Sequence, residues 1–116
     1  MQSAKKEILE KTAKEYFDAA EDEFKKERYN SSVVLYFKAL VSLSDLFILL
    51  NTGKTPSSHT KRFEITKEKF PEVYNFLDKD FPFYQASYFQ IMTKELAGVI
   101  KDDLQIMAEK VKIKLQ

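Results

Sequence analysis

Hydrophobic residues recur along the chain at steps of three and four, a spacing that predicts α-helices. The first such stretch is expected to run from a Ser3 cap to about Arg28. Its apolar face carries Leu9, Ala13, Tyr16, Phe17, Ala20 and Phe24. Charged residues occupy the other face, as on the exposed side of an amphipathic helix.

The second hydrophobic stretch is apolar on nearly every side. Asn30 or Ser31 is expected to cap it, and Gly53 to end it in the left-handed conformation after about Asn51. Four polar residues, Lys38 among them, interrupt its longest apolar part, which favours a buried helix over a membrane span. A helix of this kind is central in a bundle or buried on two sides, the second side being a partner subunit.

The remainder of the chain predicts shorter helical segments after a polar connector at residues 53–63. One begins near Ser57 or Ser58 and reaches Phe70, and Pro71 opens a continuation that ends at residues 78–82. Pro82 opens a short segment through Tyr88, and Thr93 caps the last long helix. The pattern therefore predicts one all-α domain over residues 1–116, an up-and-down bundle of four main helices with a short extra segment.

Composition narrows the classes of function. Nineteen basic residues oppose eighteen acidic ones, for a net charge of +1, which argues against general coating of DNA or RNA. The absence of cysteine excludes disulfides, thiolate zinc sites and cysteine nucleophiles. Because the N-terminus also lacks the apolar stretch of a signal peptide, we expect a cytoplasmic protein with no membrane partner.

His59 is the one histidine in the sequence. It has two interpretations, a general acid/base or phosphate contact in a ribonuclease-like site, or a loop residue that helps to cap a helix. No inward-facing Glu-x-x-His motif is present, so neither a metal site nor a cofactor is expected. Gly53-Lys54-Thr55 lacks the upstream glycine and preceding strand of a phosphate-binding loop.

The connector and the following segment are locally basic. Five basic side chains between Lys54 and Lys69 face two acidic ones, a net charge of +3, close to several hydroxyl groups. Such a surface suits a phosphate or an acidic partner, although an ordinary solvated loop has the same composition. The candidate contact residues are Lys54, Ser58, His59, Lys61 and Arg62.

Aromatic residues gather between residues 81 and 89, with no Arg or Lys among them. Stacking on nucleic-acid bases is therefore less favoured than core packing or a seam between two copies of the chain. With the apolar second helix, this run defines a candidate dimer seam of Tyr36, Phe47, Phe83, Tyr84 and Tyr88.

The order of three loose motifs resembles the HEPN family. They are Ala20-x3-Phe24-x4-Tyr29-Asn30-Ser31-Ser32-x3-Tyr36-Phe37, the connector Gly53 to His59, and Ala86-Ser87-Tyr88 before the last helix. The resemblance implies a helical bundle, commonly homodimeric and often encoded beside a minimal nucleotidyltransferase. Some members are toxin ribonucleases with an Arg-x4-6-His motif. Here Phe83 stands where the arginine would fall, and residues 85–89 contain no histidine.

The predicted function is accordingly a non-catalytic HEPN-type subunit, homodimeric, associated with a minimal nucleotidyltransferase, with nucleotide or RNA as a candidate ligand. Two alternatives stay open. One is a degenerate ribonuclease that uses His59 with Lys54 or Arg62. The other is a helical scaffold that binds only protein.

Overall fold

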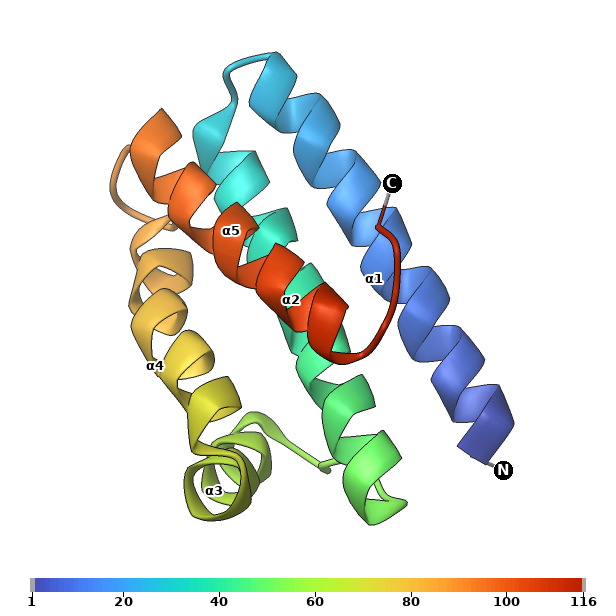
Figure 1. Ribbon diagram of the computed structural model, residues 1–116. Helices are drawn as coiled ribbons and strands as arrows, with labels where there is room; N and C mark the ends of the chain where they lie inside the picture. Colours follow the sequence, from blue (N-terminus) through green and yellow to red (C-terminus); the bar gives the residue numbers. More distant parts are fainter. Residues whose placement is uncertain (1, 116) are drawn as a thin grey trace.

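The computed structural model describes residues 2–115, with side chains from residue 4 onward, and it is all-helical in that range (Figure 1). Its helices are α1 (Gln2–Lys25), α2 (Tyr29–Thr52), α3 (His59–Lys69), α4 (Pro71–Ala86) and α5 (Lys94–Lys110). No strand occurs among these residues. The predicted all-α class is therefore confirmed, and the expected Ser3 cap lies outside the described side chains.

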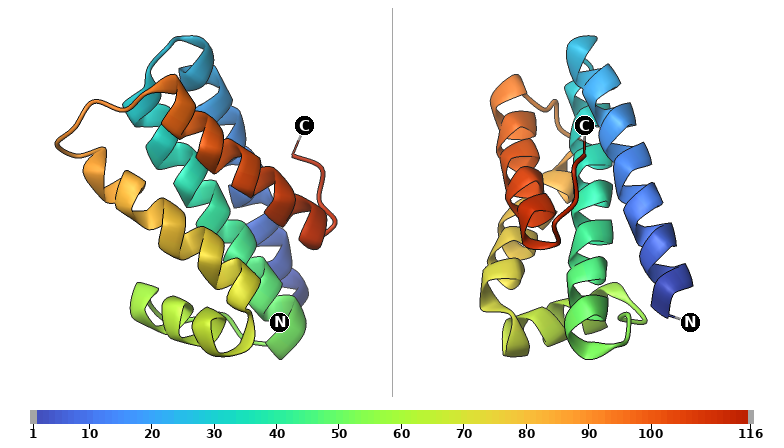
Figure 2. Two further views of the ribbon diagram at one scale, coloured as in Figure 1. Left: turned by 60° about the vertical axis from the view of Figure 1, so that its left-hand side comes forward. Right: turned by 45° about the vertical axis from the view of Figure 1, so that its right-hand side comes forward.

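α2 is the central helix and packs against α1, α4 and α5, whereas α3 packs mainly on α4. α5 lies over one face of α2, between α1 and α4, and α3 crosses the end of α4 (Figures 1 and 2). The radius of gyration of 13.5 Å is that of a compact chain of this length, about 13 Å. The largest fully buried side chains are Tyr36, Phe17, Phe37, Leu40, Leu43, Leu46, Ile48, Leu49, Leu77, Ile100, Leu104 and Met107.

Three helix boundaries follow from local chemistry as expected. Gly53 ends α2 with a φ of 80°, in the left-handed region where a side chain would be strained, and its N–H donates to the carbonyl of Leu49. Ser58 caps α3 by accepting a hydrogen bond from the backbone of Lys61. Thr93 caps α5 in the same way.

The helix end predicted at residues 78–82 was wrong, because a tertiary contact outweighs the local signal. α4 continues through Pro82 to Ala86, although proline cannot donate the usual helical hydrogen bond. Phe81 and Tyr84, on either side of Pro82, pack against Phe37 of α2, and this packing favours continuation of the helix. The first helix also ends earlier than expected, at Lys25.

Asn30 does not cap α2, which starts at Tyr29 without a side-chain cap. Its amide instead holds the α4–α5 loop, donating to the carbonyls of Ser87 (2.8 Å) and Gln90 (2.7 Å). Its Oδ1 accepts from the backbone of Met92 at 2.9 Å, and the Met92 side chain is buried. One residue thus fixes both ends of a loop nearly sixty positions away.

In length and composition α2 resembles a membrane span, with a mean hydropathy of 2.1 over its most apolar window. Within the fold, however, 61% of that window is buried. A core helix passes the same test, and packing against α1, α4 and α5 accounts for the apolar residues of α2 that are buried.

Candidate ligand-binding site

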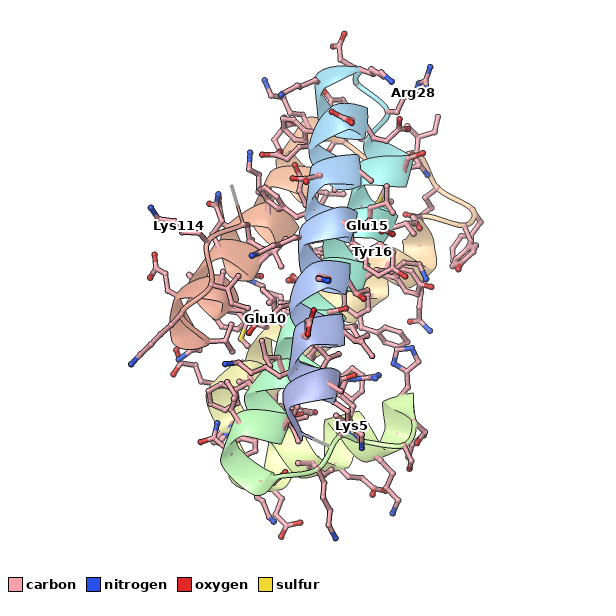
Figure 3. All side chains as sticks on the ribbon, turned by 90° about the vertical axis from the view of Figure 1, so that its right-hand side faces the viewer. Lys5, Glu10, Glu15, Tyr16, Arg28 and Lys114 are labelled. Atoms are coloured by element: carbon pink, nitrogen blue, oxygen red, sulfur yellow. The ribbon has the colours of Figure 1, made fainter. Side chains whose placement is uncertain are left out.

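The face of α2 opposite α5 is not covered by another helix of the described chain, and three hollows lined partly by α2 lie along it, near Val34, Lys38 and Asp45. Figure 3 shows Tyr16 on the side of α1 away from α5 and Lys114, bordering this open face. The middle depression, here called the central hollow, has a volume of about 240 Å³. Its lining comes from four helices and comprises Thr12, Tyr16, Phe37, Lys38, Val41, Ser42, His59 and Tyr84.

Lys38 is the cation of the central hollow. Its ammonium lies 6.0 Å from the ring centroid of Tyr84, and among residues 4–115 no carboxylate lies within ion-pair distance of it. The Tyr84 ring stacks on Phe37 with centroids 4.9 Å apart, which fixes this aromatic wall. An unpaired ammonium beside aromatic rings attracts an anion that also carries a flat apolar part.

A buried ion pair positions the start of α3. Arg62 donates two hydrogen bonds to Asp45 of α2, from Nε to Oδ1 at 2.6 Å and from Nη2 to Oδ2 at 2.9 Å. The two side chains are only 11% and 13% exposed, so the pair is shielded from water and salt. Because His59 begins the same helix, this pair sets where its ring lies.

Arg62 also determines the chemistry of His59. Its Nη1 lies 2.8 Å from Nδ1 of His59, and a guanidinium can only donate, so Nδ1 is the acceptor. The neutral ring therefore carries its hydrogen on Nε2. Partial burial, followed by the positive charges of Arg62 and Lys38, lowers the pKa of His59, with Asp45 opposing the shift. At neutral pH His59 is thus an uncharged hydrogen-bond donor.

His59 also lines a second depression, the lateral hollow, of about 500 Å³ between α3 and α4. Its aromatic walls are Phe63, Tyr74 and Phe81, with ring centroids 5.6 to 6.1 Å apart along the series. Lys67 lies over the Tyr74 ring at 5.9 Å. The two hollows meet at His59, and each combines aromatic walls with one lysine.

Of the five predicted contact residues, only His59 lines the hollows. Arg62 lies behind it and positions it, while Ser58 is engaged as the helix cap. Lys61 forms an exposed pair with Glu64 at 3.3 Å, and Lys54 lines neither hollow. The basic connector is therefore not one convergent cluster.

The predicted dimer seam is corrected at Tyr36. Its side chain is fully buried, and its hydroxyl donates to Glu21 Oε2 at 2.5 Å, so a partner subunit has no access to it. Phe47 and Phe83 are partly buried against the core. Tyr84 walls the central hollow, and Tyr88, 72% exposed, is the most accessible of the predicted set.

Lys38, Tyr16 and Tyr84 were not predicted as ligand contacts. The signal for Lys38 was present, since it is a lone basic residue within an apolar helix. The part of the chain that the structure describes holds no group of three or more His, Asp or Glu residues placed to bind a metal. Comparisons with protein-family models, with curated proteins and with solved structures find no match.

Proposed function

We propose that the chain is a non-catalytic binding subunit of the HEPN type, in which α1, α2, α4 and α5 form the up-and-down bundle and α3 is the extra segment. Its ligand is a nucleotide, free or as one unit of an RNA, held in the central hollow. The observation that carries the proposal is that Lys38 and His59 line the same hollow as three aromatic rings, Tyr16, Phe37 and Tyr84.

These groups divide the recognition of a nucleotide between them. The Lys38 ammonium and the Nε2–H of His59 are donors suited to phosphate oxygens. The partly exposed rings of Tyr16 and Tyr84 suit the face of a base, an interaction worth about 1–3 kcal/mol per base, whereas Phe37 is buried and supports the Tyr84 ring. The central hollow is smaller than the roughly 300–1,000 Å³ of typical ligand sites, and the lateral hollow beyond His59 supplies further room.

Binding is tested by NMR titration of labelled protein with AMP, adenosine and inorganic phosphate. AMP is expected to shift signals around Lys38 and Tyr84, and Lys38→Gln to weaken its binding by roughly tenfold or more, from the loss of one charged contact. Lys61→Gln is the matched control, because Lys61 lies in an exposed pair away from the hollow. Shifts that are absent, or equally strong in Lys38→Gln, rule out this site.

The geometry at His59 argues against the ribonuclease alternative. A general base needs a free lone pair, yet Nε2 carries the hydrogen and Nδ1 accepts from Arg62. We expect no cleavage of a mixed RNA substrate. Cleavage that is abolished by His59→Ala would restore the enzymatic interpretation.

Homodimer formation is a second proposal, favoured by exposed apolar residues in the α4–α5 loop, which Asn30 holds by hydrogen bonds. Tyr88, Phe89 and Ile91 are 72%, 76% and 90% exposed, beside an apolar hollow of about 320 Å³ lined partly by Val34 and Leu35. A protruding apolar group next to a hollow suits a two-fold contact between copies. A cytoplasmic location and a nucleotidyltransferase partner rest on the resemblance and the composition.

Light scattering tests the dimer: a particle of 13.6 kDa, the monomer mass, would contradict it. Phe89→Ser is expected to shift a dimer toward monomer. Ile106→Ser, which removes an exposed apolar residue of α5, serves as the control and is expected to leave the mass unchanged.

A further inference from the structure

One buried carboxyl group takes no part in the candidate site. Asp80 lies on α4 with no exposed surface, and neither of its oxygens has a hydrogen-bond partner among the described residues. Burial of an isolated carboxylate destabilises its charged form, so the group favours its neutral, protonated form.

The group that faces Asp80 is a second carboxyl, Asp103 of α5, which is 5% exposed. Lys79 of α4 lies 2.8 Å from Oδ2 of Asp103 and supplies one positive charge to the pair. Asp102 of α5 acts on Lys79, and no other charged side chain, from α2 included, acts on Asp80 among the described residues. One lysine therefore faces two buried carboxyl groups.

Burial, followed by the neighbouring Asp103 carboxyl group and its negative charge, raises the pKa of Asp80 to about 9, and Lys79 opposes the shift only in part. The folded chain thus holds a proton that the unfolded chain releases above about pH 4. Because the folded-state pKa is the higher one, stability is full at low pH and falls as the pH rises toward 9.

We propose that Asp80 and Asp103 share one proton and that this proton is a pH-sensitive latch between α4 and α5. In the latched state the Asp80 O–H donates to the Asp103 carboxylate, whose other contact is Lys79. Loss of the proton places two carboxylates against each other in a buried position. The repulsion then separates α4 from α5 near their midpoints.

The latch sits where α4 is locally weakest. Pro82, two residues after Asp80, leaves the helix without one backbone hydrogen bond. Phe81 and Tyr84, which wall the lateral and central hollows, flank that position. Opening of the latch therefore loosens the candidate site. This consequence rests on the proposed function, whereas the existence of the latch does not.

The first experiment is an NMR titration of carboxyl-labelled aspartate in the free wild-type protein. The Asp80 signal is expected to titrate well above pH 7. A midpoint for Asp80 near 4 overturns the proposal. This reading needs neither a variant nor a ligand, so failure of AMP binding does not affect it.

The second experiment measures unfolding by urea between pH 6 and 8.5. Release of one proton lowers the wild-type folding constant up to tenfold per pH unit, and Asp80→Asn, an isostere of the protonated acid, is expected to abolish that dependence. Asp78→Asn is the matched control and keeps it. An equal pH dependence in Asp80→Asn contradicts the latch. Should that variant fail to fold, Asp103→Asn is expected to lower the Asp80 midpoint in the NMR titration, and an unchanged midpoint contradicts the shared proton.

AMP affinity then separates the two proposals. If AMP binds, its affinity in the wild type is expected to fall between pH 7 and pH 9 and to stay level in Asp80→Asn. If the AMP affinity depends on pH equally in both proteins, the coupling between the latch and the site is refuted. The NMR titration of Asp80 is not affected by that outcome.

Discussion

Tyr36→Phe is the most direct test of the core. The Tyr36 hydroxyl is buried and donates to Glu21 Oε2 at 2.5 Å, while Glu21 Oε1 lies 3.0 Å from Lys101. Burial and the Glu21 carboxylate raise the pKa of Tyr36, so it remains a neutral donor throughout the accessible pH range. The contact joins α1 to α2, and Lys101 extends it to α5.

The magnitude follows from the type of hydrogen bond. A bond to a charged group contributes about 1.5–3 kcal/mol, and phenylalanine keeps the ring packing without creating a cavity. Unfolding entropy of about 2.1 cal/mol/K per residue gives roughly 4 °C of Tm per kcal/mol for a chain of this length. We therefore expect Tyr36→Phe to lower the free energy of unfolding by about 1.5–3 kcal/mol and Tm by about 6–12 °C.

The assay is urea and thermal unfolding followed by circular dichroism. Tyr16→Phe is the matched control, because no hydrogen bond holds its hydroxyl among the described residues, and it is expected to change stability by less than about 0.5 kcal/mol. If Tyr36→Phe also lowered the free energy of unfolding by less than about 0.5 kcal/mol, the buried contact would be refuted. A double-mutant cycle with Glu21→Gln is expected to give a coupling energy of about 1 kcal/mol or more.

Three further outcomes are expected. Asn30→Ala removes three hydrogen bonds from the α4–α5 loop, so stability should fall by about 1–3 kcal/mol and amide exchange should rise around Met92; unchanged exchange would contradict the role of Asn30. Asp45→Asn leaves Arg62 buried without its charge partner and should cost about 3–5 kcal/mol in urea unfolding, against less than 1 kcal/mol for a surface pair. The His59 ring should titrate by NMR below its ordinary pKa, and Arg62→Met should raise that titration midpoint. Because the folded-state pKa is the lower one, the contribution of His59 to stability is present above about pH 6.5 and is lost as the pH falls.

The sequence predicted those features that depend on neighbours in the chain. Gly53, Ser58 and Thr93 end or start helices because each satisfies backbone groups within four residues of itself. Helical spacing also identified the buried face of α1, where Ala13 and Phe17 have no exposed surface. Local chemistry was sufficient in these places.

Features that depend on distant partners were not predicted. Asn30 has the sequence context of a cap, yet its hydrogen bonds go to a loop almost sixty residues away. Asp102 and Asp103 are adjacent residues of the same type, yet Asp102 is exposed and Asp103 is buried beside Asp80. Period and composition do not reveal which helix covers which, so they cannot distinguish a solvated carboxylate from a buried one.

The open face explains why α2 is apolar nearly all round. A helix covered on every side requires no charge, and a helix with one solvated face normally carries several. α2 fits neither case, because its uncovered face presents Val34, Leu35 and Val41 with Lys38 as the one cation between them. Partly exposed apolar surface is costly in an isolated subunit and becomes favourable once a ligand or a second chain covers it. The composition of α2 is thus that of a helix with its core on one side and a partly buried apolar face on the other, the face where we propose that a ligand or a second chain binds.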